Sequence, residues 1–244
     1  MIVALALTLV VSGTSGCKQS ELDSSHSNWK KLQFSPKAGA ILLQEAETSP
    51  CVWNVQAEGD RVTIQRVSTQ SLQRPHELRT QFAGGTLVGE DRGEWGGSLT
   101  VLDGSNQSPR NILSKNVLQM FPVRDGVAVI TGDLPRNEGS VWLYSNAEGH
   151  GWSIRKEAEL HGYPKVIGKS GDRILLAYGD AVAILKDFNE RQIAALPLLE
   201  IWPNSLAQDA KGDVYVGMNA FVVRLVSDRN GYSQQWFTQP DCSR

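Results

Sequence analysis

The chain has 244 residues, with 24 Lys and Arg against 26 Asp and Glu, and a formal net charge of −2. It contains no basic block, which excludes the electrostatic footprint of a nucleic-acid-binding protein, so no nucleic acid is expected as a partner. Residues 29–244 are long enough to bury one sizeable core, and an all-β unit of this size counts as a single domain.

The N-terminus has the pattern of a secretory signal peptide. Residues 1–16 form an apolar run that is too short to span a bilayer and that ends in small residues. Cys17 follows this run directly and precedes a polar, serine-rich stretch. The arrangement resembles the lipobox of bacterial lipoproteins, which implies a lipidated Cys17 and a lipid-anchor tether over residues 17–28. The alternative is an ordinary cleaved signal peptide in which Cys17 has no special role.

Four stretches of the chain share one pattern: a glycine turn, an apolar strand, a closing glycine and a second apolar strand. The closing glycines recur at intervals of 43, 47 and 38 residues, at Gly89, Gly132, Gly179 and Gly217. A period near 43 is that of a four-stranded propeller blade. The sequence therefore predicts an all-β domain over residues 29–244, folded as a five-bladed β-propeller of four-stranded antiparallel blades. Six blades would need more residues than the chain provides.

The period assigns the blades in chain order. A degenerate first blade starts at KKLQFS and ends in two strands around a Gly59-Asp60 turn. The second strand of each blade should be buried on both faces, and the outer strands half exposed. Residues 189–195 should form an outer strand rather than a helix. The five blades are predicted at residues 30–68, 72–114, 117–160, 163–198 and 201–239.

Residues 205–217, SLAQDAKGDVYVG, are similar to the repeat of NHL-type and related bacterial propellers, in which an Asp-x-x-Gly-Asp turn leads into a Val-Tyr-Val strand. The resemblance covers one blade well, and it implies a fold rather than a reaction. Gly212 is expected to take a turn conformation that other residues adopt only with strain, and Asp213 to cap the turn. The chain as a whole thus resembles bacterial extracytoplasmic propellers.

Two cysteines remain besides Cys17, one early and one near the end of the chain, Cys51 and Cys242. An even pair in an exported protein predicts a disulfide, because the expected location, the periplasm or cell envelope, is oxidising. The bridge would join the last strand to the first blade, where a ring of blades has no covalent link. Two free thiols are the alternative.

Functional residues are sought where the loops between second and third strands meet the connections between blades, because a propeller brings both to one end. Carboxylates, amides and aromatic rings gathered there could bind a cation such as calcium, or a polyhydroxylated ligand. The connections are expected to add His76, His161, Tyr163 and Asn204. The predicted ligand-binding residues are Glu90, Asp91, Arg92, Trp95, Asp133, Asp180 and Trp202.

Within this set, the segment 89–97 stands out because four glycines surround three acids, an arginine and a tryptophan. Trp and Arg together are favoured at binding hot spots. A structural interpretation stays open, in which each turn acid satisfies turn amides and Arg92 pairs with Glu94 or Asp91.

Two functions remain open. The first is an envelope-anchored, non-catalytic module that binds a protein or a carbohydrate-like ligand and meets the membrane only through its N-terminal lipid. It is favoured because no catalytic triad, metal cluster or nucleophile elbow can be assembled from sequence neighbours. The second is a hydrolase similar to propeller glycosidases or calcium-dependent lactonases, with Glu90, Asp133 and Asp180 at the channel mouth. An acid that recurs in every blade is better explained by its turn, so an enzyme is the less favoured interpretation, and no cofactor is expected unless calcium binds.

Overall fold

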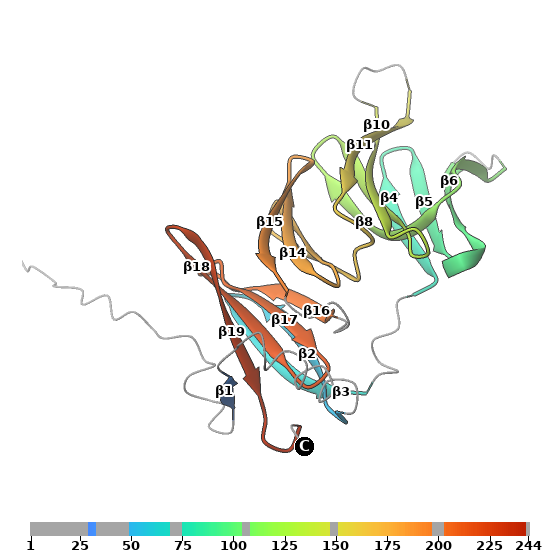
Figure 1. Ribbon diagram of the computed structural model, residues 1–244. Coiled ribbons are helices and arrows are strands. Elements are labelled where there is room, and N and C mark those ends of the chain that lie inside the picture. Colours follow the sequence, from blue (N-terminus) through green and yellow to red (C-terminus); the bar gives the residue numbers. More distant parts are fainter. Residues whose placement is uncertain are drawn as a thin grey trace, which may run out of the picture.

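A computed structural model of the chain describes residues 29–32, 49–68, 75–103, 108–146, 151–196 and 203–242. These residues form antiparallel strands and one short 3-10 turn, so the predicted all-β class is confirmed. Figure 1 shows the sheets following one another in chain order round an arc, from β4–β7 through β8–β11 and β12–β15 to β16–β19. No helix in the described part of the chain is long and apolar enough to cross a membrane. The predicted signal peptide and tether lie outside the described residues.

The first complete sheet is a meander in which each strand pairs with the next one along the chain. Short turns permit this pairing, since the register sets Phe82 opposite Gly85 and leaves two residues between the strands. The predicted inner strand has the observed bounds, and the outer strand ends one residue before the predicted Ser114. The strands are β4 (Glu77–Phe82), β5 (Gly85–Asp91), β6 (Gly97–Asp103) and β7 (Arg110–Leu113).

The next two sheets repeat this four-stranded antiparallel meander. One comprises β8 (Asn116–Val123), β9 (Gly126–Asp133), β10 (Glu138–Ser145) and β11 (Ser153–Leu160). The other comprises β12 (Val166–Ser170), β13 (Arg173–Ala177), β14 (Ala181–Lys186) and β15 (Asn189–Ala195). Their outer strands β11 and β15 alternate exposed and partly buried residues, as the sequence predicts for edges that face water.

The last sheet corrects one assignment. Its strands β16 (Pro203–Gln208), β17 (Val214–Met218), β18 (Val222–Asp228) and β19 (Gly231–Thr238) are joined by β1 (Lys30–Leu32). β1 pairs antiparallel with β19, so the KKLQFS segment begins in the last sheet and not in the first blade. The pairing covers residues 236–238 of β19 and satisfies backbone groups that an open sheet edge would leave unpaired.

The other strands that the structure describes in the predicted first blade form one hairpin. It consists of β2 (Val52–Glu58) and β3 (Arg61–Val67) around the predicted Gly59-Asp60 turn. β2 packs along the last sheet, where the buried Ser205 hydroxyl donates to the Trp53 carbonyl and accepts from the Val55 amide. The residues predicted as the second strand of that blade lie outside the described ranges.

Burial of the second strands holds the sheets together. β9, β13 and β17 are buried along almost their whole lengths, and the centre of β5 is buried as well. Four hydrophobic clusters each join one sheet to the next, from β4–β7 to β8–β11, to β12–β15, to the last sheet and to the β2–β3 hairpin. None of these four clusters, within the part of the chain described, joins the hairpin to β4–β7.

Three closing glycines mark close approaches between neighbouring elements. A Cβ at Gly89 would lie 2.5 Å from Val117 in the next sheet, and one at Gly217 would lie 2.3 Å from the Trp53 carbonyl of β2. At Gly132 it would meet the Tyr163 ring, in the connection to the following sheet, at 2.7 Å. Any larger residue at these positions would force neighbouring sheets apart, which is the physical reason for glycine there.

The turn that resembles NHL-type repeats has the expected glycine conformation but a different cap. Gly212 has a φ of +89°. The carboxylate that accepts the turn amides belongs to Asp209, which bonds the backbone N–H of Lys211 and of Asp213. Asp213 instead forms a buried ion pair with Arg224 of β18, at 2.7 Å between Oδ2 and Nη2, so its predicted capping role is wrong. An adjacent strand offers this side chain a charged partner that the local sequence does not reveal.

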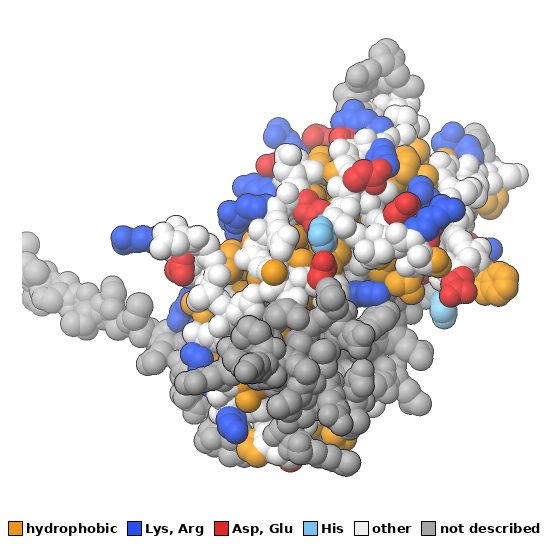
Figure 2. Space-filling view, in the orientation of Figure 1, with side chains coloured by type: hydrophobic (Ala, Val, Ile, Leu, Met, Phe, Trp, Pro, Cys, Tyr) orange, Lys and Arg blue, Asp and Glu red, His pale blue; other side chains and the backbone are white. Residues whose placement is uncertain are grey.

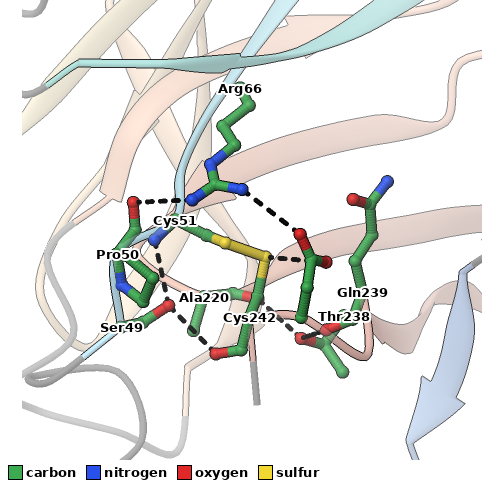
Figure 3. Close-up of a disulfide and its surroundings, with 9 residues drawn as sticks. Ser49, Pro50, Cys51, Arg66, Ala220, Thr238, Gln239 and Cys242 are labelled. Carbon is green, nitrogen blue, oxygen red and sulfur yellow. Dashed lines mark hydrogen bonds and ion pairs between the residues drawn. A yellow bond between two sulfur atoms is a disulfide. The ribbon is translucent and has the colours of Figure 1, made fainter. Parts of the chain in front are cut away.

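The predicted disulfide between Cys51 and Cys242 is confirmed, with the two Cα atoms 5.5 Å apart. It joins the residue before β2 to the end of the last sheet, as predicted. Figure 3 shows the bridge among polar contacts that fix the same two segments: the Ser49 hydroxyl bonds the Cys242 carbonyl, and Arg66 reaches Asp241 at 3.3 Å. The two ends of the described domain are therefore joined covalently and by hydrogen bonds.

Replacing both cysteines, Cys51→Ser with Cys242→Ser, should destabilise the protein by about 4 kcal/mol, because the unfolded chain regains the freedom of a loop that spans nearly the whole domain. Urea denaturation of the oxidised wild type and the double variant measures the loss. Equal midpoints would show that the bridge does not constrain the unfolded chain.

Candidate functional site

The turns between second and third strands meet the connections between sheets at one end of the molecule, here called the connection face. Four such contacts are made: Asp91 N–H to the His76 carbonyl, Tyr163 N–H to the Asn137 side chain, the His161 ring to Asp180, and the Asn204 amide to Asn219. The turns between second and third strands and the connections between sheets, which the sequence predicts at one end, are thus in contact at four places.

The β5–β6 loop is held by a buried amide. Asn116 opens the next sheet and is 7% exposed. Its Oδ1 accepts the Arg92 N–H at 3.1 Å, and its Nδ2 donates to the Gly93 carbonyl at 2.6 Å. Asp91 adds a third bond by accepting the Gly93 N–H at 2.9 Å. These contacts hold the loop backbone in place. A buried side-chain amide cannot exchange its protein partners for water, so breaking these bonds would leave it unsatisfied.

The charged residues of this loop pair within it. Glu90 Oε2 accepts from Arg92 Nη2 at 2.5 Å and from the Ser98 hydroxyl at 2.9 Å. Arg92 therefore pairs with Glu90, and not with the Glu94 or Asp91 of the structural alternative. The arginine side chain remains 62% exposed, and an ion pair so open to water contributes little to stability.

Trp95 is the residue that the loop leaves uncovered. It ends the 3-10 turn η3 (Gly93–Trp95), which lies between glycines of positive φ, +59° at Gly93 and +75° at Gly96. The Trp95 side chain is 91% exposed. A tryptophan usually buries much of its large apolar surface, so an exposed one on a fixed backbone has the form of a binding anchor.

Asp133 has the local role of the structural alternative. Its Oδ1 accepts the Arg136 N–H at 3.3 Å inside the β9–β10 turn, and its Oδ2 lies 3.6 Å from the Arg136 guanidinium. These contacts are those of a turn aspartate. They account for the Asp133 carboxylate without a bound ligand.

Asp180 belongs to a polar cluster that the sequence reveals only in part. Its Oδ2 lies 3.1 Å from His161 Nε2, which reaches it from the preceding connection. Glu190 of β15 completes the cluster, because its Oε2 accepts the backbone N–H of His161 at 2.8 Å and its Oε1 accepts the Tyr178 hydroxyl at 2.7 Å. Tyr178 and Glu190 are absent from the predicted site. Alternation along residues 189–195 could have placed Glu190 on a strand, but not beside His161.

Burial raises the pKa of the Tyr178 phenol well above its ordinary value of 10.0. The hydrogen bond to Glu190 raises the pKa further, as do the negative charges of Glu190 and Asp180. The phenol therefore stays protonated and acts as a hydrogen-bond donor to Glu190 throughout the neutral range.

Cavities lie at both ends of the sheets. One of about 210 Å³ adjoins the His161 cluster. A larger one of about 530 Å³ lies at the opposite end, between the turns of two neighbouring sheets, and its lining includes Phe121, Lys169 and Phe188. The second cavity could not be predicted from the sequence, because its walls come from turns that are far apart along the chain.

The remaining predicted residues are placed as follows. Trp202 and Cys17 lie outside the described residues. Among the residues that are described, the one cluster of three or more His, Cys, Asp or Glu ligand atoms within 4.8 Å of one another is Cys51, Asp241 and Cys242, which is the disulfide with a neighbouring acid. In the view of Figure 2, Lys and Arg are interspersed with Asp and Glu, so this surface carries no field of a single sign.

No protein-family model matches the chain, and no curated protein sequence matches it. Among solved structures, it is similar to the N-terminal domain of Nup159, with 13% identity, a TM-score of 0.45 and coverage of 86% of this chain and 65% of that one. A second similar structure is an S. cerevisiae complex of Dbp5 bound to Nup159, Gle1, IP6 and ADP, with 12% identity, a TM-score of 0.43 and the same coverages. The chain spans less than two thirds of their length. These scores are too low to assign a fold or a function from the similarity. The architecture is therefore taken from the strand pairing described above.

The Tyr178 hydroxyl gives a pH-dependent prediction. Below about pH 10 both folded and unfolded forms keep the phenolic proton, so its contribution to stability is complete. Above that pH the unfolded phenol ionises while the folded one does not, and the free energy of unfolding falls by about 1.4 kcal/mol per pH unit. Tyr178→Phe lacks this proton. It should lose about 1 kcal/mol at neutral pH through the missing hydrogen bond, and this deficit should shrink between about pH 9 and about pH 11.

Urea denaturation of both proteins across this range tests the prediction. Parallel stability curves for wild type and Tyr178→Phe would contradict a raised pKa at this phenol.

Proposed function

We propose that the protein is a lipid-anchored component of a bacterial cell envelope, and that its domain is a five-bladed β-propeller which binds a protein partner through the connection face. The single observation that carries the binding proposal is Trp95, 91% exposed at the tip of a loop that the buried Asn116 holds in place. Because the loop backbone is already held, less conformational freedom is lost when Trp95 binds a partner, which favours affinity.

Five blades are supported by the sheet order. Three four-stranded sheets, the last sheet and the β2–β3 hairpin pack in sequence, and the disulfide joins the hairpin to the last sheet. A covalent link at this position fits the closing point of a ring, where the first and last blades meet.

A protein is the favoured partner because of the shape and charges around Trp95. The tryptophan projects from a short turn with the exposed charges of Arg92 and Glu94 beside it, whereas a site for one sugar would enclose its ligand. Aromatic and arginine side chains are the residues enriched at protein interfaces. A carbohydrate-like ligand is the alternative outcome of the test below.

The hydrolase interpretation finds less support. Two of its three proposed acids already have local partners: Glu90 accepts from Arg92 and Ser98, and Asp133 accepts within its own turn. The third, Asp180, is bonded to His161. Glu90 and Asp133 therefore have structural roles in their own loops, and Asp180 is engaged with a histidine of the neighbouring connection.

Photo-crosslinking in the envelope tests the binding proposal. A photoreactive phenylalanine analogue replacing Trp95 should give discrete protein adducts, whereas the same residue at the exposed Asn230, in the β18–β19 turn at the opposite end, should not. Trp95→Ala should weaken capture of the adduct partner while changing stability by less than about 0.5 kcal/mol. Asn116→Ala should weaken capture and also lower the free energy of unfolding by about 1 to 2 kcal/mol, because it leaves the Arg92 N–H and the Gly93 carbonyl without their hydrogen-bond partner.

Two results would overturn the proposal. One is an identical adduct pattern at both positions. The other is a loss of stability in Trp95→Ala as large as that of a core substitution, which would make the loop structural.

Lipid anchoring has its own test. Cys17→Ser should remove the lipid and move the protein from the membrane fraction to the soluble periplasmic fraction, because one thioether-linked lipid is the proposed membrane contact. Mass spectrometry of the mature N-terminus provides the control, since an unmodified Cys17 in the wild type would disprove lipidation.

A further inference from the structure

The cavity beside the His161 cluster has an unusual balance of hydrogen-bonding groups. Its volume is about 210 Å³, and its lining consists of His161, Tyr178, Ala181, Ala183, Glu190 and Gln192. It lies between the connection that carries His161 and the outer half of the β12–β15 sheet. Asp180 adjoins it through the imidazole.

Glu190 already accepts two donors of this cluster. The Tyr178 hydroxyl has one hydrogen, which it donates to Glu190. The backbone N–H of His161 is also donated to Glu190. The His161 ring is engaged with the Asp180 carboxylate through Nε2.

Acceptor capacity, by contrast, remains. A carboxylate has about four lone-pair sites, and the two bonds described for Glu190 occupy only part of them. The Gln192 amide adds both donors and an acceptor to the lining. Neither Lys nor Arg is among the lining residues, whereas the Glu190 carboxylate lines the cavity and the Asp180 carboxylate lies against the His161 ring beside it. A cation that has donors and no acceptor complements these two carboxylates.

Geometry separates the possible cations. The ligand atoms of His161, Asp180 and Glu190 do not converge within 4.8 Å of one another, so these residues do not form a ready metal site. An ammonium group suits the cavity better, since it is a compact charge with three donors. The methyl groups of Ala181 and Ala183 give the carbon chain of an amine an apolar wall.

We propose that this cavity binds a protonated primary amine, with Glu190 as its main charged partner and Asp180 as the second. The amine can come from a lysine side chain of a bound protein or from a free alkyl amine. The lysine source rests on the proposed protein-binding function, while binding of a free amine does not depend on it.

Titration of the purified protein followed by NMR of the His161 ring tests the site. The probes are Nα-acetyl-lysine methylamide for the lysine source and cadaverine for the free amine. Nα-acetyl-norleucine methylamide, which has the same stem without the charge, is the matched control. Saturable shifts with either amine and none with the norleucine compound are expected.

Variants locate the binding. Glu190→Gln and Asp180→Asn should each weaken amine binding by about tenfold, since each removes one charge from the cluster. Asp172→Asn, an exposed acid of the same sheet that pairs with Lys186 at the opposite end, should leave binding unchanged.

The outcomes are decisive in both directions. Preference for the lysine compound over cadaverine supports the side-chain source, and equal binding supports free amines. Absence of saturation with both amines, or equal binding of the norleucine compound, overturns the proposal, as does equal weakening by Asp172→Asn. Amine binding that survives Trp95→Ala separates this site from the Trp95 loop, so the two proposals can fail independently.

Discussion

Burial of the second strand of each complete sheet between its neighbours is the constraint on which the rest of the structure depends. Leu87, Val129, Leu175 and Val216 of these strands are fully buried. A strand that is buried on both faces needs neighbouring elements packed closely against it. Glycines near the ends of these strands, Gly89, Gly132 and Gly217, permit that close approach. Once the sheets are stacked in this way, the meander places every second-to-third-strand turn at the connection face.

Much of this architecture can be predicted from sequence because its causes are local. Glycine turns and apolar runs locate the inner strands, and the repeat period then locates the more polar ones, as the observed bounds of β4 and β15 show. The Cys51–Cys242 bridge is predictable because one pair of cysteines in a chain that is expected to be exported has few other uses. The pairing of β1 with β19 is not predictable in this way, since three residues carry no register and their partner lies at the other end of the chain.

The side-chain partners follow a similar division. Glu90 and Arg92 are two residues apart on an extended segment, where side chains share a face, so their ion pair could have been found from spacing alone. Asp213 pairs with Arg224 across neighbouring strands, and Glu190 meets His161 across the boundary between two sheets. Such pairs depend on register and on packing, which the local sequence does not specify.

The connection face contains side chains that are bonded within its loops and side chains that are exposed, and sequence position alone does not distinguish the two. Asp133 accepts within its own β9–β10 turn, and Glu90 accepts from Arg92 and Ser98. Trp95, by contrast, is exposed on a loop whose backbone other residues hold. The buried Asn116 holds this loop most directly, because its one side-chain amide bonds two successive loop residues, Arg92 and Gly93. In the proposed function, the acids of such loops hold the backbone of the binding surface, and an exposed side chain such as Trp95 meets the partner.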